Sequence, residues 1–278
     1  MLNPNLNRGS LAEIFANQKP FPFIVIDNFI IKEEFDKITN AVKCLYSKSS
    51  SDSTGVRWET EAELNKWGST GTKLPIELIN LESFLKSDEI LSFLMDVSGF
   101  ENLQYTKQTN NSGYSFLHAM MPGSFLAPHT DHTMDMNGTN AYHVLNIVYY
   151  VSDDWNANWG GGTSIHSTNG DIYTDVEYRP NRAVVFMHSP LSIHGTTEVS
   201  SFAKGFRFSV YFDYYSNEPT PYKHLNIKKF NLAWSPHLFY LKNFRSYFKI
   251  KNQKYLKYWY AYYKSRLKAS LFGNRTSH

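Results

Sequence analysis

The amino-acid sequence predicts a mainly β fold with flanking helices, in the α+β class. From about residue 103 onward, short apolar or alternating runs are separated by clusters of Gly, Asn, Asp and Pro. Repeated short strands with turn signals between them are typical of a β-sandwich or a β-barrel. Before residue 103, apolar residues recur instead at helical spacing. The predicted strands of the β core are 112–121, 141–151, 162–166, 183–187 and 206–215.

Three elements are predicted ahead of this core. Residues 21–31 are rich in β-branched and aromatic side chains and predict a buried strand. Residues 32–46 place their apolar side chains on one helical face, and residues 76–98 do the same. We therefore expect one strand and two helical segments in the N-terminal part of the domain.

The segment 47–75 is polar, rich in Ser, Thr and Gly, and has no clear period. We predict a long loop, and loops of this length in compact domains are often lids or binding loops. A solvated surface loop is the alternative interpretation. The aromatic and charged side chains of this segment would suit a polar, anionic substrate. They are Arg57, Trp58, Glu59, Lys66 and Trp67.

Charge divides the chain into two parts. Of 28 Lys and Arg residues, 13 lie in residues 219–278, which contain no Asp or Glu. Residues 1–218 contain the remaining 15 basic residues and all 25 acidic residues, which gives this part a net charge of about −10. We predict a folded domain over residues 1–218, with a β core at about 103–215. Residues 219–278 form a basic, aromatic extension with helical spacing.

Three roles are compatible with the basic extension. Its aromatic residues can pack on the acidic domain or on a second copy of the chain, giving a homodimer. Tyr and Trp also favour membrane interfaces, and lysines favour anionic lipids, so peripheral membrane contact is a second role. Lysine with stacking aromatics also suits nucleic acid, which we rank third.

The chain has a single cysteine, Cys44. No intrachain disulfide can form and cysteine-based zinc sites are excluded, which favours a reducing compartment. The N-terminal residues lack the pattern of a secretory signal, and no run approaches the roughly 20 apolar residues of a membrane-spanning helix. We expect a soluble, cytoplasmic protein, which the extension can hold at the inner face of a membrane.

A metal site is predicted near the start of the β core. His129 and Asp131 lie two residues apart, and in a strand such residues point to the same face. His194 offers a third ligand, 65 residues after His129. Two histidines and one carboxylate form the facial triad of non-haem iron(II) oxygenases, which leaves three positions open. His188 is the rival for the third position.

An anion-binding group is predicted on the last strand of the core. Arg207 lies 13 residues after His194, among apolar and aromatic neighbours. Its guanidinium can hold the far carboxylate of a 2-oxoacid through two parallel hydrogen bonds. Ser209 and Tyr211 share the strand parity of Arg207, so their hydroxyls can contribute. The remaining histidines of the core are expected to serve packing or substrate contact: His118, His132, His143 and His166.

Two stretches of the sequence resemble the prolyl-4-hydroxylase-like branch of the Fe(II)/2-oxoglutarate-dependent oxygenases. Residues 149–155 (YYVSDDW), followed by three glycines at 160–162, are similar to one family stretch. Residues 179–186 (RPNRAVVF), leading to His194 and then Arg207, are similar to another. The resemblance covers roughly residues 112–215.

This resemblance implies a double-stranded β-helix, the jelly-roll fold of the cupin-like proteins. It implies that the iron ligands are His129, Asp131 and His194, that Arg207 binds 2-oxoglutarate, and that Tyr150 contacts this cosubstrate. The implied cofactors are Fe(II), 2-oxoglutarate and O2, with ascorbate as a supporting reductant. One departure concerns Met121, which precedes Pro122-Gly123 where oxygen-sensing prolyl hydroxylases have a tyrosine. This departure argues against a prolyl-peptide substrate.

The expected activity is a dioxygenase reaction that couples decarboxylation of 2-oxoglutarate to C–H hydroxylation of a small-molecule, glycan or lipid-linked substrate. Related halogenases lack the carboxylate ligand, so Asp131 favours hydroxylation. The first alternative is a protein hydroxylase that acts on prolyl or other side chains. The second is a non-catalytic jelly-roll adaptor that acts through its basic extension.

Overall fold

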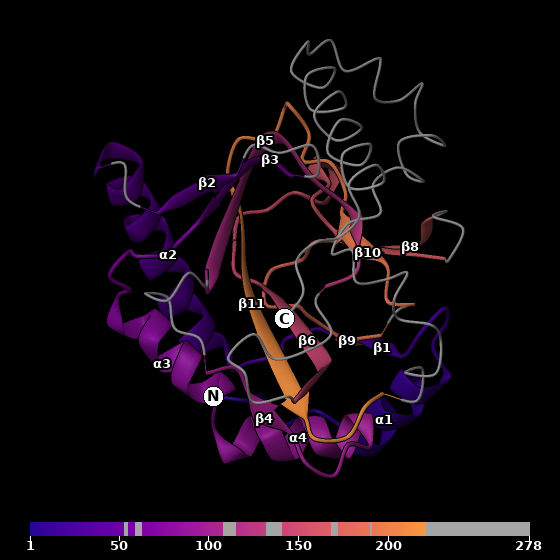
Figure 1. The fold of residues 1–278 in the computed structure, drawn as a ribbon. Coiled ribbons are helices and arrows are strands. Elements are labelled where there is room, and N and C mark those ends of the chain that lie inside the picture. The colour runs from indigo at the N-terminus through magenta and orange to yellow at the C-terminus, as the bar shows by residue number, and fades with distance from the viewer. Residues whose placement is uncertain are drawn as a thin grey trace, which may run out of the picture.

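The central feature of the fold is an antiparallel, barrel-like sheet with helices along one side (Figure 1). The computed structural model describes residues 1–52, 55–58, 63–107, 115–131, 141–167, 172–189 and 191–220. The strands are β1 (Phe23–Ile26), β2 (Val56–Trp58), β3 (Glu63–Gly68), β4 (Gln104–Tyr105), β5 (Leu117–His129), β6 (Tyr142–Tyr150), β7 (Thr163–His166), β8 (Ile172–Val176), β9 (Ala183–Met187), β10 (His194–Thr196) and β11 (Arg207–Ser216).

The order of neighbouring strands is β1-β9-β6-β11-β5-β10-β7-β8, and each neighbouring pair is antiparallel. The long strand β5 links the two halves, because its first part pairs with β11 and its last part with β10. Strand β3 also pairs with β5, and β2 pairs with β3. The sheet is antiparallel and barrel-like, which agrees with the predicted mainly β core.

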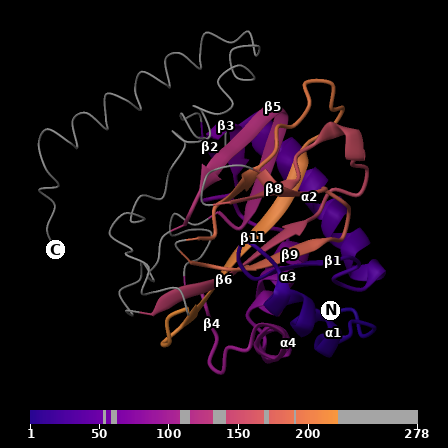
Figure 2. The same cartoon turned by 90° about the vertical axis from the view of Figure 1, so that its right-hand side faces the viewer.

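Four α-helices precede most of the sheet in the described part of the chain. They are α1 (Arg8–Asn17), α2 (Lys32–Asp52), α3 (Ile76–Leu85) and α4 (Asp88–Ser98), and a short 3-10 helix spans Ala157–Trp159. The α-helices gather on one side of the sheet in both views (Figures 1 and 2). Because each of these helices has an apolar face to bury, the sheet is covered there and remains free for chemistry on its other face.

Strand β11 shows how the sequence divides the two faces. Val210, Phe212 and Tyr214 lie in the same buried cluster as apolar residues of α2, α3 and α4. The alternate residues Arg207 and Ser209 are buried on the opposite face, inside the barrel. Since successive side chains of a strand point to opposite faces, one ten-residue run builds both the core and one wall of the site.

The predicted loop at 47–75 is wrong over most of its described length. Helix α2 continues to Asp52, and β2 and β3 form an antiparallel hairpin that joins the barrel through β5. Trp67 is 1% exposed and lies in the core, with its ring 5.5 Å from that of Tyr46. The segment lacks a sequence period because its order comes from pairing with β5, which lies about fifty residues later in the chain.

The other predicted elements are confirmed with shifted ends. The segment 76–98 is two helices, because Lys86 and Ser87 interrupt it between α3 and α4. Strands β8 and β10 were not predicted, because each is too short and too polar to give an apolar pattern. The extension 219–278 lies outside the described residues from position 221 on, so the division at 218/219 stays a prediction. In the described ranges, none of the helices combines the length and the apolar character needed to span a bilayer.

Candidate active site

The two predicted histidine ligands come from directly opposite positions on paired strands. His129 ends β5, His194 begins β10, and the two residues are register partners. Their ring centroids lie 4.5 Å apart. Residues paired in this way have close Cβ atoms, so strand pairing alone brings together two imidazoles that lie 65 residues apart. The residue after His194 is Gly195. A larger residue would not fit there, because an added Cβ would lie 2.7 Å from the carbonyl oxygen of Leu126.

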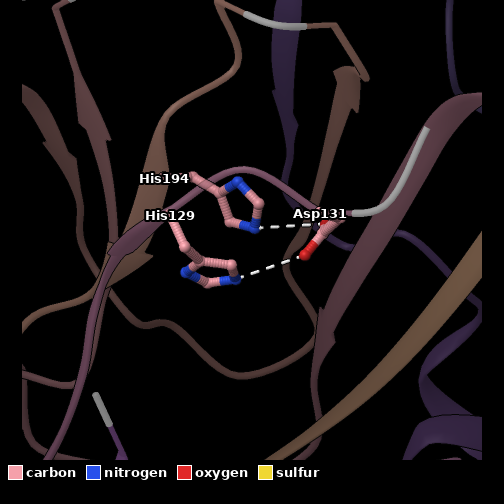
Figure 3. A group of neighbouring side chains, drawn as sticks. All are labelled: His129, Asp131 and His194. Carbon is pink, nitrogen blue, oxygen red and sulfur yellow. Dashed lines mark ion pairs between the residues drawn. The ribbon is translucent and has the colours of Figure 1, made fainter. Parts of the chain in front are cut away.

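Asp131 completes the group just beyond the end of β5. Its Oδ1 lies 3.2 Å from Nε2 of His129, and its Oδ2 lies 3.5 Å from Nε2 of His194 (Figure 3). One ligand atom from each residue fits within 4.8 Å of the others. Both histidines are buried, and His188 is not a member of the group. The structure therefore favours His194 over His188 as the third ligand.

The protonation states of the group suit a metal. Burial lowers the pKa of His194 to about 4, against the opposing attraction of Asp131. Burial alone would raise the pKa of Asp131, but His194 and His129 outweigh it and hold this pKa well below its usual range. At neutral pH the site thus has an ionised carboxylate beside a neutral imidazole, as metal binding requires. The Nδ1 of His194 lies 2.9 Å from the carbonyl oxygen of Ser192, which directs the Nε2 lone pair toward Asp131.

Arg207 is buried at the start of β11, with 3% of its surface exposed. Its Nε donates to the carbonyl oxygen of Gly161 at 2.5 Å, and its Nη1 donates to Oγ of Ser209 at 2.7 Å. The guanidinium lies over the rings of Tyr150 and Tyr178, with centroids 5.2 and 5.4 Å away. Gly161 is needed here, because a Cβ would lie 3.3 Å from the Arg207 side chain and the backbone φ is +74°.

No Asp or Glu in the described part of the chain forms an ion pair with Arg207. A buried guanidinium without an anionic partner is costly. The surroundings are also electropositive: burial lowers the pKa of His118 well below its usual value, and the charges of Lys66 and Arg207 lower it further. This part of the barrel is therefore suited to an anion.

A comparison with family models identifies the β core. Residues 115–214 match the model of the 2OG-Fe(II) oxygenase superfamily. Over this range the chain carries an oxygenase domain of that superfamily. The matched range contains the whole metal-binding group and Arg207. A comparison with curated protein sequences gives no match.

Solved structures of similar fold include a prolyl hydroxylase from Trichoplax adhaerens, in complex with a peptide fragment of the hypoxia inducible factor oxygen degradation domain. It is 18% identical, with a TM-score of 0.52 over 75% of this chain and 90% of that one. A prolyl-4-hydroxylase from Pseudomonas putida is 14% identical, with a TM-score of 0.49 over 75% and 99% of the two chains. HygX from Streptomyces hygroscopicus, with nickel, 2-oxoglutarate and hygromycin B bound, is 13% identical, with a TM-score of 0.48 over 76% and 88%. The first of these similarities supports the double-stranded β-helix fold.

The donor set of this oxygenase fits the cofactors of its superfamily, Fe(II) and 2-oxoglutarate. Two imidazole nitrogens and one carboxylate make the facial triad typical of non-haem iron(II), and His129, Asp131 and His194 supply it. The predicted identity as a 2-oxoglutarate-dependent dioxygenase is confirmed.

The other predicted site residues are distributed around the triad. Tyr150 bonds Oγ1 of Thr163 through its hydroxyl at 2.6 Å and lies beside Arg207. Tyr211 lies nearer the metal than expected, because its hydroxyl donates to Oδ2 of Asp131 at 2.8 Å. His166 is fully buried, with Nε2 2.9 Å from Oγ of Ser164. His132 lies outside the described residues.

A second polar cluster lies near the far end of β11 from Arg207. The rings of His143 and His188 stack at 4.2 Å, and Nε2 of His143 lies 3.4 Å from Oδ1 of Asp213. Tyr215 donates to Oδ2 of Asp213 at 3.4 Å. We call these four residues the β11 polar cluster. At roughly 3.3 Å per residue, Asp213 is about 20 Å along the strand from Arg207.

Sequence reasoning missed Tyr178, Asn146 and Asp213. Asp213 shares the strand parity of Arg207 and Tyr211, so the alternation of β11 contained a signal for it. Asn146 sits in a mostly apolar strand, where a buried amide is unusual. Tyr178 precedes β9, and its position beside Arg207 depends on tertiary packing alone.

Proposed function

We propose that this oxygenase hydroxylates a C–H bond of a small, polar substrate: a small molecule, a glycan or a lipid-linked group. The observation that supports this substrate class is the β11 polar cluster. His143, His188 and Asp213 are buried polar residues, and they give this part of the barrel a polar character. Recognition of hydroxyl or amine groups needs polar atoms, whereas an aliphatic peptide side chain such as proline needs an apolar wall.

In this proposal the protein residues hold and orient the reactants. His129, Asp131 and His194 hold the iron, while Arg207 and Ser209 hold the far carboxylate of 2-oxoglutarate, with Tyr150 beside it. When bound, iron(II) and 2-oxoglutarate convert O2 and substrate C–H into succinate, CO2 and substrate C–OH. Asp131 fills the position that a halide would need, which favours hydroxylation. Phe186, whose ring lies 4.5 Å from that of His194, excludes water from one side.

The metal and cosubstrate sites predict a spectroscopic signal. Purified protein mixed with Fe(II) and 2-oxoglutarate without oxygen should develop the visible charge-transfer band of the chelate. We expect His129→Ala to abolish the band and His166→Gln to retain it, because His166 is buried nearby but contacts Ser164. Anaerobic absorption titration checks this. A band of full intensity in a folded His129→Ala protein would contradict the ligand assignment.

The substrate class predicts where oxygen atoms appear. Aerobic incubation of the oxygenase with a cell extract, Fe(II) and 2-oxoglutarate under ¹⁸O2 should add one labelled oxygen to a polar metabolite or glycan, while the other labelled oxygen enters succinate. The product label should be absent without 2-oxoglutarate. Mass spectrometry of the metabolite, glycan, lipid and peptide fractions identifies the product. Labelling found, apart from succinate, in peptides alone would contradict the proposal and support the protein-hydroxylase alternative.

For the basic segment 219–278 we propose a contact role rather than a catalytic one. Its charge complements that of residues 1–218, which supports packing on the domain or on a second copy of the chain. Peripheral contact with an anionic membrane is the second candidate, and nucleic acid is the third.

A further inference from the structure

Two side chains donate to the same oxygen of the carboxylate ligand. The hydroxyl of Tyr211 lies 2.8 Å from Oδ2 of Asp131, and Nδ2 of Asn146 lies 3.2 Å from it. Asn146 also donates to the Tyr211 hydroxyl. Tyr211 comes from β11 and Asn146 from the neighbouring strand β6, so two strands of the barrel wall fix one ligand. Oδ1 of Asp131 lies 3.2 Å from Nε2 of His129, and Oδ2 lies 3.5 Å from Nε2 of His194.

A carboxylate oxygen has about two lone-pair directions for hydrogen bonds or metal ions. The two donors occupy those of Oδ2, whereas Oδ1 keeps its own for the metal. We infer that Asn146 and Tyr211 are positioning residues that make Asp131 a ligand through Oδ1 alone. A carboxylate that chelated through both oxygens would occupy one of the three positions that 2-oxoglutarate and O2 need.

The orientation of the Asn146 amide is set by two carboxylates. Its Nδ2 also donates to Oδ1 of Asp213 at 3.1 Å, so one amide hydrogen points toward Asp213 and the other is shared between Oδ2 of Asp131 and the Tyr211 hydroxyl. The opposite rotamer would place its carbonyl oxygen between two carboxylates, which is electrostatically unfavourable. Asn146 is fully buried, and its Oδ1 has no hydrogen-bond partner among the described residues. The Asn146 side chain therefore acts here through the hydrogen bonds that it donates.

The same contacts connect the metal ligand to the β11 polar cluster. From Asp131 the connection runs through Asn146 to Asp213, and from there to His143. Tyr211 remains a donor, since burial raises its pKa well above the usual value and the charges of Asp131 and Asp213 raise it further. The inference concerns iron binding, so it holds for any substrate and does not depend on the proposed substrate class.

The test is metal affinity in substrate-free protein. We expect Tyr211→Phe to weaken Fe(II) or Mn(II) binding about tenfold, and the double variant Tyr211→Phe/Asn146→Ser about a hundredfold, as is usual for residues that support a ligand. The charge-transfer band with Fe(II) and 2-oxoglutarate should also shift, because the charge on the coordinating oxygen changes. Anaerobic calorimetry and absorption spectra measure both quantities.

Tyr214→Phe is the matched control. Its buried hydroxyl donates at 2.9 Å to the carbonyl oxygen of Leu85, on the opposite face of the same strand. The control loses a hydrogen bond of β11 without touching the metal site, so its metal affinity and band should match the wild type. Thermal melting of the metal-free proteins identifies any variant that fails to fold. Unchanged affinity and band in folded Tyr211→Phe protein would overturn the inference, whatever product the enzyme makes.

Discussion

Replacing Arg207 with alanine is expected to weaken 2-oxoglutarate binding roughly 100- to 4,000-fold. The guanidinium is buried, has no ion-pair partner among the described acidic residues, and is preoriented by Gly161 and Ser209. Breaking a buried charge pair costs about 3–5 kcal/mol, and each 1.4 kcal/mol is tenfold in affinity. Titration of the charge-transfer band with 2-oxoglutarate at fixed Fe(II) gives the dissociation constant directly.

Two further variants identify the cause of this loss. Ser209→Ala removes only the hydroxyl that accepts from Nη1 of Arg207, so we expect it to weaken binding about tenfold or less. Arg207→Lys keeps the charge but loses the two-pronged geometry, so its affinity should lie between those of the other two variants. Metal affinity without 2-oxoglutarate should be unchanged in all three. An Arg207→Ala protein that is folded and binds 2-oxoglutarate normally would exclude Arg207 from the cosubstrate site.

Asn181→Ala is expected to lower the free energy of unfolding by about 3–5 kcal/mol. The buried side chain of Asn181 accepts from the backbone N–H of Ile30 at 3.2 Å and from the hydroxyl of Tyr149 at 2.9 Å. Its Nδ2 donates to the carbonyl oxygen of Ile30 at 2.9 Å. The substitution leaves three buried groups without partners, at about 1–3 kcal/mol each before relaxation. Urea unfolding of both proteins measures the difference.

Asn28→Ala separates the hydrogen bonds from the backbone strain. Asn28 and Asn181 both have positive φ, +50° and +58°, a conformation that alanine adopts at a cost of roughly 1–2 kcal/mol. Asn28 is exposed, and only its backbone carbonyl is seen to accept a hydrogen bond, from Asn3. We therefore expect about 1 kcal/mol for Asn28→Ala. Equal losses in the two variants would mean that the side-chain contacts of Asn181 contribute little.

The contacts of Asn181 give a structural reason for one of the two stretches that resemble the oxygenase family. Residues 179–186 carried part of the family resemblance, and this stretch ties the segment after β1 to the turn before β9. The resemblance alone gave no physical reason for an asparagine there. The reason is a left-handed backbone position whose side chain must satisfy the N–H and C=O of one residue, Ile30.

The amino-acid sequence by itself determined the chemistry of the iron site. The two-residue spacing of His129 and Asp131 indicated a pair of ligands, although Asp131 lies just beyond the end of β5, and the order of His194 and Arg207 completed the set. Apolar periodicity likewise predicted the principal strands and helices. These features are readable from the sequence because they depend on neighbours along the chain.

The tertiary structure alone decided which groups meet across strands. The His129–His194 pairing, the bonds of Tyr211 and Asn146 to Asp131, and the hairpin within 47–75 all depend on register between distant segments. A register shift of one residue would turn each of these side chains to the opposite face of its strand. The alternating apolar pattern of each strand limits the possible registers, but the choice of partner strand depends on burial of the whole sheet against the helices.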